Sequence, residues 1–362
     1  MFHLRATPRH GFAIAGASLM LAVGALGAAS PARAERWFGS VSASCDSFGE
    51  CFATPDSPDR PADSALLHLL RSGKANAPLE FHVTVNKPVE GGVAIRLETE
   101  QGVIALAAGS DVLTRRETYN GRDYLMGYFI ADARATELLA MLRRATSARI
   151  VIAVAGEPQT ITVNLNGLDE ALRYFDEHQG RTGAQDALIE KGPRKPADAA
   201  APRPLPAKDA WPREIAAIFA REKCEDEIAT FDSLKEGFVA APAPGRELWQ
   251  IPCAGGNYNI LFTLVEVRNG DMKSARALRF PTRLHKRSDS VLVNPSWWDA
   301  RKELWAFEHG RAFGDCGTVT RYRWTPAGFS LLDQRRKDDC DGKSADPWTK
   351  WPVAKSRRAG KR

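Results

Sequence analysis

Cys316 is the residue whose surroundings most invite a chemical interpretation, because it lies between Gly314 and Gly317 in the stretch HGRAFGDCGTVTRYRW at residues 309–324. A thiol here could be a nucleophile, a metal ligand or half of a disulfide. A nucleophile needs a base, and His309 lies seven residues upstream. A zinc site needs closely spaced ligands, but the sequence has no C-x-x-C and no histidine at zinc-site spacing from a cysteine pair. Glycines permit the tight turn that a disulfide between strands requires, so we favour the disulfide.

The cysteine count supports that interpretation. The chain has six cysteines, two in the predicted N-terminal domain and four in the predicted C-terminal domain. Even numbers are what bridging within each domain requires, although four cysteines allow three pairings. Pairing between neighbours along the chain is our preference, which gives Cys45–Cys51, Cys224–Cys253 and Cys316–Cys340. On the chain-entropy argument the last bridge contributes about 3 kcal/mol to stability.

Residues 1–34 have the pattern of a signal peptide. A basic start precedes an apolar run from Gly11 to Ala29, and Ala32-Arg33-Ala34 provides the small-x-small cleavage site. No second membrane-length apolar stretch follows, so we expect no integral membrane span after cleavage. The mature chain is expected to begin at Glu35, in the periplasm or outside the cell, where disulfides persist.

The net charge of +6 is concentrated at the two ends of the chain. The leader carries three arginines and no acid, and the last thirteen residues, 350–362, carry six basic residues and no acid. The remainder has 41 basic and 44 acidic residues, or −3, which argues against the spread basic surface of a nucleic-acid-binding protein. We expect 350–362 to be a solvated basic tail, with contact to an anionic surface as the alternative.

A proline-rich segment predicts the division into domains. Residues 192–212 contain six prolines, which favour an extended, semi-rigid linker. We therefore expect an N-terminal domain at 35–191 and a C-terminal domain at 213–349. In the first, alternating stretches such as LEFHVTV at 79–85 predict strands, and helices are expected from Asp132 and over 167–178. The pattern is that of a β-sandwich-like domain.

The C-terminal domain contains a weak internal repeat. Glu-Leu-Trp occurs at Glu247 and again at Glu303, an offset of 56 residues, and each copy leads into a glycine-rich turn with a cysteine and two longer strands. The Asn-Gly of RNGD at 268–271 predicts a hairpin turn in the first copy, and TPAG at 325–328 supplies the turn in the second. We expect two disulfide-linked β-meanders packed as two sheets in a mainly β protein with few helices.

Three residues are candidates for binding, and the sequence predicts no cofactor and no metal site. Trp297 and Trp298 are adjacent in NPSWWDAR, which we expect to be a loop, so their rings must point in different directions and one could stack on a sugar. Arg181 lies between two glycines in DEHQGRTG and could receive a carboxylate or phosphate in bidentate fashion. Alternatively, Arg181 pairs with Asp176 or Glu177 and fixes the end of the helix.

Three stretches together resemble a known family. RWFGSVSASCDSFGECFA opens the predicted mature chain, VNLNGLDEALRYFDEHQGRTGAQDALIEKG closes the N-terminal domain, and LWQIPCAGGNYN and GRAFGDCGT lie in the C-terminal half. They resemble the bacterial secreted family catalogued as domain of unknown function 1176. The first stretch is also similar to the invasion-associated locus B family, except that Ser40-Val41 stand where that family has Asp-Trp. The resemblance implies an envelope protein with an N-terminal β-sandwich, and it brings no activity.

The sequence therefore predicts a periplasmic or secreted protein that acts as a non-catalytic binding module for an envelope protein or glycan. The alternative is an envelope hydrolase with an acidic catalytic pair that the sequence does not identify.

Overall fold

The computed structural model describes residues 35–57, 66–85, 93–119, 122–153, 158–224, 237–255, 258–286, 288–311, 314–341 and 346–355. The predicted signal peptide at 1–34 lies outside the described residues. The described part is mostly β, with three α-helices, as the sequence predicts for the fold class. None of the helices in these ranges is long and apolar enough to cross a membrane.

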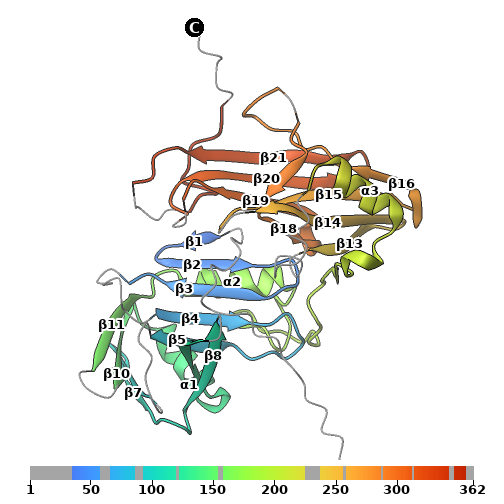
Figure 1. Ribbon diagram of the computed structural model, residues 1–362. Helices are drawn as coiled ribbons and strands as arrows, with labels where there is room; N and C mark the ends of the chain where they lie inside the picture. The colour runs from blue at the N-terminus through green and yellow to red at the C-terminus, as the bar shows by residue number, and fades with distance from the viewer. Residues whose placement is uncertain are drawn as a thin grey trace, which may run out of the picture.

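The N-terminal half consists of two antiparallel sheets and two helices (Figure 1). The larger sheet has the order β1–β2–β3–β4–β5–β9–β8, and the smaller sheet has the order β11–β10–β6–β7. The larger sheet contains β1 (Arg36–Phe38), β2 (Val41–Cys45), β3 (Cys51–Pro55), β4 (Leu66–Arg71), β5 (Glu80–Val85), β8 (Val112–Tyr119) and β9 (Arg122–Ile130). The smaller sheet contains β6 (Ala94–Thr99), β7 (Gly102–Leu106), β10 (Ser147–Ala153) and β11 (Gln159–Asn164).

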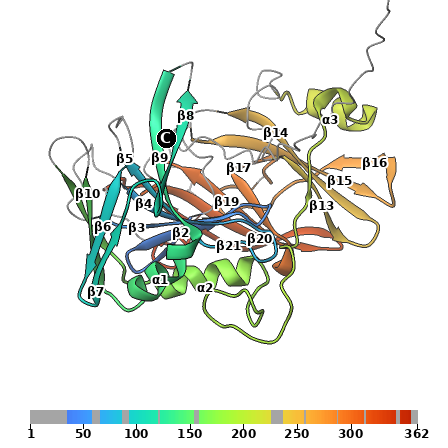
Figure 2. The same cartoon turned by 90° about the horizontal axis from the view of Figure 1, so that it is seen from below.

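Alternation of side chains explains how these sheets share one core. On β6, Ile95 and Leu97 are buried while Arg96 between them is exposed, the pattern of a strand with one face toward the interior. Helices α1 (Asp132–Leu142) and α2 (Leu168–His178) lie on one side of the larger sheet (Figure 2) and contribute their apolar stripes to the same core. Both helices lie where the sequence predicts them. Asp132 stands in the first turn of α1, with Ala131 as the N-cap.

The proline-rich segment 192–212 has extended backbone and touches both halves. The Ala199 N–H donates to the carbonyl oxygen of Gly73 at 2.6 Å in the N-terminal half. Further on, β12 (Arg203–Pro204) pairs with β13 of the C-terminal half, and a 3-10 turn, η1 (Lys208–Ala210), follows. The segment is therefore anchored at separate points, with Ala199 and Trp211 buried and most of the residues between them exposed.

The C-terminal half is built from two antiparallel sheets. One has the order β12–β13–β14–β15–β16, with β17 also paired to β15, and the other has the order β18–β19–β20–β21. The first contains β13 (Phe238–Ala243), β14 (Arg246–Gly255), β15 (Ile260–Arg268), β16 (Asp271–Ala277) and β17 (Val291–Val293). The second contains β18 (Pro295–Trp298), β19 (Glu303–His309), β20 (Gly317–Thr325) and β21 (Gly328–Lys337), with η4 (Asp299–Arg301) after β18.

The two Glu-Leu-Trp copies begin equivalent strands, β14 and β19, in these two sheets. Leu248 and Leu304 point into one interior shared by both sheets, so the prediction of two packed meanders is confirmed. The predicted Asn-Gly turn joins β15 to β16, with positive φ at Asn269 (51°) and Gly270 (69°) as such a turn requires.

The outer faces of the two sheets are covered differently. Trp249 on β14 packs under helix α3 (Arg213–Arg221), whose apolar stripe includes Ile215 and Phe219. Trp305 on β19 instead joins the core of the N-terminal half. Helix α3 is not among the elements that the sequence predicts; its nine residues follow directly on the proline-rich segment.

Two expectations about exposed segments are wrong. The start of the predicted solvated tail 350–362 is packed along β21: the Ala354 N–H donates to the Gln334 carbonyl at 2.8 Å, and Trp351 is 3% exposed. Residues after 355 lie outside the described part. The predicted NPSWWDAR loop forms β18, which pairs with β19. In both places an apolar side chain finds a core that the local sequence does not reveal.

Candidate functional site

All six cysteines are in disulfides, and the bridges are the three that neighbour pairing gives. Cys316 is bonded to Cys340, which removes the thiolate that a nucleophile would need. The glycines around Cys316 serve close packing. A Cβ at Gly310 would lie 2.7 Å from the Cys316 Sγ, and one at Gly317 would lie 2.0 Å from the Glu308 carbonyl oxygen. The opening stretch is therefore a crowded strand junction.

His309, the potential base, is an aromatic packing residue. Its ring is 9% exposed and stacks on Phe307 with centroids 3.9 Å apart. Burial lowers the pKa of His309 to about 4, because the charged imidazolium loses its hydration. Neither ring nitrogen has a hydrogen-bond partner among the described residues. The ring is thus neutral at physiological pH.

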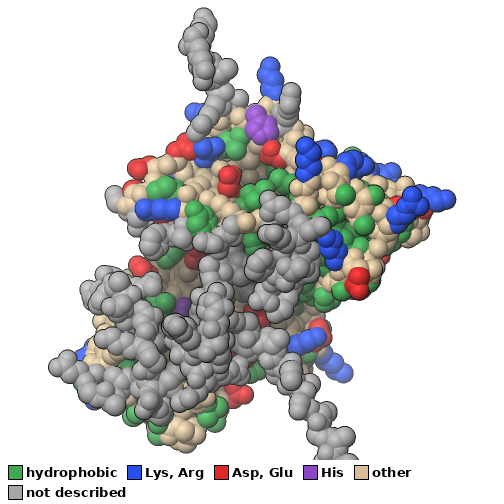
Figure 3. Space-filling model, viewed as in Figure 1, with side chains coloured by type: hydrophobic (Ala, Val, Ile, Leu, Met, Phe, Trp, Pro, Cys, Tyr) green, Lys and Arg blue, Asp and Glu red, His purple; other side chains and the backbone are tan. Residues whose placement is uncertain are grey.

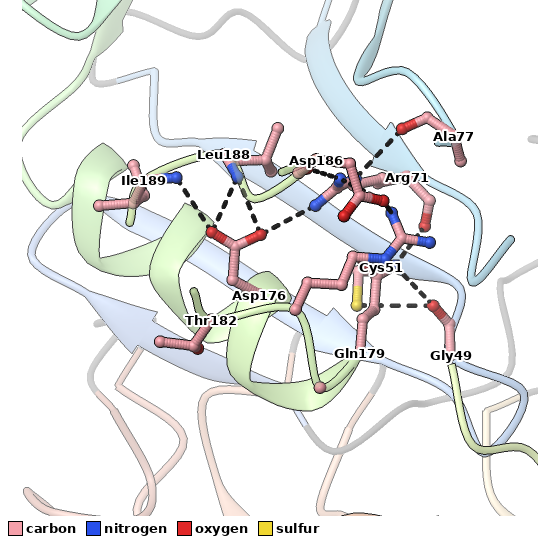
Figure 4. A network of polar contacts seen from close by, with 12 residues as sticks. Gly49, Cys51, Arg71, Ala77, Asp176, Gln179, Thr182, Asp186, Leu188 and Ile189 are labelled. Carbon is pink, nitrogen blue, oxygen red and sulfur yellow. Dashed lines mark hydrogen bonds and ion pairs between the residues drawn. The ribbon is translucent and has the colours of Figure 1, made fainter. Parts of the chain in front are cut away.

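Arg181 belongs to a buried network at the end of α2, of which Figure 4 shows Arg71, Asp176, Gln179 and Asp186. Its side chain is 1% exposed and lies 3.5 Å from Asp186, while it also donates to the Lys74 carbonyl oxygen. The expected pairing with Asp176 or Glu177 is wrong, because Asp176 pairs with Arg71 at 2.8 Å. With so little exposure, the guanidinium of Arg181 holds loops together and does not face solvent.

Further hydrogen bonds connect this network to neighbouring backbone groups. Asp176 accepts hydrogen bonds from the backbone N–H groups of Leu188 and Ile189, and Gln179 Nε2 donates to the Gly49 carbonyl at 2.8 Å. Burial, and next the nearby charge of Arg181, lower the pKa of Arg71 to about 10, which leaves it protonated at neutral pH. The network ties α2, β4 and the 183–190 loop into one unit.

Trp297 and Trp298 point in opposite directions, as adjacent strand residues must, but each side chain is buried in a hydrophobic core. Trp297 is 1% exposed in the interior of the C-terminal half, and Trp298 is 3% exposed against the N-terminal half. The Trp298 ring lies 4.8 Å from that of His178, with the Arg301 guanidinium 4.1 Å above it. The expectation that one of the two rings is exposed is wrong.

The remaining candidate is a cluster of arginines around Glu266 on β15, hereafter the arginine cluster. Glu266 is 1% exposed and accepts from Arg246 at 2.9 Å, Arg268 at 3.2 Å and Arg276 at 2.8 Å. These arginines come from the three adjacent strands β14, β15 and β16. Their side chains are 22%, 44% and 46% exposed, respectively. The cluster therefore has a buried acidic centre and a solvent-facing basic rim.

The charges of the cluster do not balance. Three guanidinium groups surround one carboxylate, which leaves an excess of two positive charges. Burial alone would raise the pKa of Glu266, but hydrogen bonds and charge from Arg276, with further contributions from Arg268 and Arg246, outweigh burial and lower it. Arg203 pairs with Glu247 and Lys302 pairs with Asp299, so these two pairs leave the excess unchanged.

The cluster lies at the end of the sandwich where the hairpin turns of its sheets meet, hereafter the hairpin end. A hollow of about 480 Å³ lies there, lined by residues 241–247, Gly270 and Lys302. Lys and Arg side chains gather at the end of the molecule where Figure 1 places β15 and β16 (Figure 3).

The arginine cluster is not evident from the sequence, although part of its signal is local. The Asn-Gly turn sets Arg268 opposite Asp271, and regular pairing would then place Lys273 opposite Glu266. A register shift between Glu266 and Arg268 places Arg276 there instead. Sequence alone does not reveal such a bulge.

Comparisons with known proteins place the chain in a family without assigning it an activity. It is 27% identical over 213 residues to the uncharacterized protein YpfG of Escherichia coli K12, a match that covers 52% of this chain and 59% of that relative. The crystal structure of invasion associated protein B from Bartonella henselae is 18% identical, with a TM-score of 0.30, and the match covers 40% of this chain and 98% of that one. Residues 35–356 match the model of a family described as protein of unknown function (DUF1176), and the chain belongs to that family.

Proposed function

We propose that this protein is a non-catalytic binding module that acts outside the cytoplasm on an envelope component, either a protein or a glycan. The observation that carries the proposal is the half-exposed arginine cluster at the hairpin end, with its excess of positive charge. The outer faces of the sandwich meet α3 and the N-terminal half, so its end is the part that can receive a partner.

The compartment is part of the proposal. Three disulfides are typical of proteins in an oxidising compartment such as the periplasm or the exterior. The signal-peptide pattern of residues 1–34 supports the same location.

The use of the buried carboxylates favours binding over the hydrolase alternative. A glycosidase needs two carboxyl groups that face one substrate bond. Three buried carboxylates of the described residues act instead as internal acceptors for arginines. These pairs are Asp176 with Arg71, Glu303 with Arg323, and Asp315 with Arg311.

Retention and turnover assays on one sample test the proposal. The mature chain is immobilised and exposed separately to solubilised envelope proteins and to an envelope polysaccharide fraction. We expect stoichiometric retention from one fraction with no new reducing ends or amino groups released. Release of such ends, with no retained material, would support the hydrolase and reject the binding module.

A further inference from the structure

We infer that the arginine cluster binds oxyanion groups, phosphate or carboxylate, carried by an anionic glycan. The inference rests on the proposed function and names its ligand class. Arginine is suited to this role because its planar fork of N–H groups matches the spacing of two oxygens on a carboxylate or phosphate.

The geometry brings two exposed forks together. Arg268 and Arg276 both donate to Oε2 of Glu266, so their donor nitrogens lie within about 6 Å of each other, or two hydrogen-bond lengths. Each uses Nε and Nη2 for that oxygen. No hydrogen bond from Nη1 of either residue to another described residue is present, which leaves a donor nitrogen on each of the two neighbouring guanidinium groups for an external oxyanion. Glu266 thus fixes the forks in place.

A second cluster shows what distinguishes this site. On the smaller N-terminal sheet, Arg96 and Arg149 both pair with Glu98, at 2.7 Å and 3.1 Å. That cluster has two arginines for one carboxylate, and its Glu98 side chain is 25% exposed. It lies on an open sheet face and carries one excess charge rather than two. It therefore provides a matched control.

A glycan suits the hairpin end better than a protein. Protein interfaces have an apolar or aromatic centre. The large apolar side chains that stand exposed among the described residues are Val103, Leu113 and Val353, and none of them lines the hairpin end. The apolar part of the hollow consists of the alanines and prolines of residues 241–244, so no aromatic ring lines it. A hollow beside a basic rim instead fits a chain of polar sugars with repeated anionic groups.

The test measures binding of three polymers by isothermal titration calorimetry. The probes are polygalacturonate, which carries carboxylates, yeast phosphomannan, which carries phosphates, and neutral dextran. We expect the wild-type chain to bind at least one anionic polymer and not dextran. The double variant Arg268→Gln/Arg276→Gln should weaken that binding about tenfold or more, while Arg246 still pairs with Glu266 and maintains the fold. The preference between the two anionic polymers identifies the oxyanion.

The control variant is Arg96→Gln/Arg149→Gln, which removes the same charge from the N-terminal cluster. Equal loss of affinity in both double variants would mean that net charge alone controls binding, and it would contradict a specific site at the arginine cluster. Polyglutamate serves as a fourth, peptide polymer, and its binding without binding of polygalacturonate or phosphomannan would overturn the glycan assignment. If the Arg268→Gln/Arg276→Gln variant still retains its partner from an envelope fraction, this inference fails and the proposed function stands. If the wild-type chain retains nothing from either fraction, the proposed function fails.

Discussion

The two meanders of the C-terminal half contain the same local arrangement of side chains, but a different part of the protein packs on each of them. In the first, Glu247 accepts from the indole of Trp249 at 3.2 Å and from Arg203 at 2.9 Å. In the second, Glu303 accepts from the indole of Trp305 at 3.0 Å and from Arg323 at 2.8 Å. In each copy one carboxylate fixes a tryptophan on its own strand and an arginine on another strand of the same sheet.

The two copies differ in burial, because α3 packs on the first sheet and the N-terminal half packs on the second. Glu247 is 29% exposed because the short helix α3 shields its sheet only partly, whereas Glu303 is 4% exposed against the N-terminal half. The repeated residues therefore build the sandwich, while the surface each sheet packs against decides what a given residue contributes. The contribution of the second meander is to hold the two halves together.

The largest expected effect is that of Trp305→Ala. Trp305 contacts Trp348 and Trp298, with ring centroids 4.6 Å and 5.6 Å apart, so truncation should lower the free energy of unfolding by about 4 kcal/mol. Urea unfolding measures the loss. Limited proteolysis should show cleavage in both halves, whereas Trp249→Ala should expose mainly the 205–224 region. Identical cleavage patterns would contradict the argument that Trp249 packs against α3 and Trp305 against the N-terminal half.

Removal of a disulfide should cost slightly less and affect both meanders alike. Cys224–Cys253 and Cys316–Cys340 close loops of 29 and 24 residues, so each double Cys→Ser variant should lose about 3 kcal/mol of unfolding free energy. Thermal unfolding of the two variants under one buffer provides the measurement. A difference much larger than 1 kcal/mol between them would mean that strain or residual structure, rather than loop length, controls the bridges.

The two glutamates should differ in proportion to their burial. Glu303→Ala leaves the buried indole N–H of Trp305 without an acceptor and should cost about 2 kcal/mol. Glu247→Ala should cost less than about 1 kcal/mol, because Arg203 is largely exposed. Glu303→Gln keeps an acceptor oxygen and serves as the control. Equal losses at 247 and 303 would contradict the argument from exposure.

The smallest effect concerns pH and distinguishes the two meanders, since residues 246–277 contain no histidine. In the N-terminal half, burial also lowers the pKa of His178 to about 4, so the contribution of His309 is measured as a difference from a variant. His309 has a pKa near 4 when folded, below its value near 6.5 in an unfolded chain. The unfolded state therefore binds more protons below pH 6.5, so stability is full above that pH and declines as the pH falls toward 4. At pH 5.5 we expect a loss of about 1 kcal/mol from this residue, which His309→Gln should abolish. Urea unfolding of both proteins across this range checks it.

The sequence predicts secondary structure well where the pattern is local. Alternation gives the strands of the N-terminal half, leucine spacing gives α1 and α2, and the Asn-Gly turn gives the β15–β16 hairpin. It is less informative about what covers each face. Trp298 is correctly expected to point away from Trp297, but only the folded chain supplies the N-terminal core against which Trp298 packs.

The same limitation applies to the candidate sites. Arg181 lies between two glycines, a pattern that suggests an accessible anion-binding site. In the folded chain, Asp186 and backbone carbonyls enclose its guanidinium. The arginine cluster depends on a register shift in β15 and β16 that has no local signature. Short-range pattern identifies residue types suited to anions, whereas tertiary register decides which of them meet.

The order of the disulfides along the chain has a consequence for how the protein matures. The three bridges join the first cysteine to the second, the third to the fourth and the fifth to the sixth, so no loop encloses another. In a chain that emerges from a channel N-terminus first, each pair can oxidise as soon as it appears, without later reshuffling. The contact between the two ends of the described chain forms later. The Trp348 indole donates to the Glu35 carbonyl oxygen at the start of the described chain, so the first strand receives this neighbour only after residue 348 has emerged.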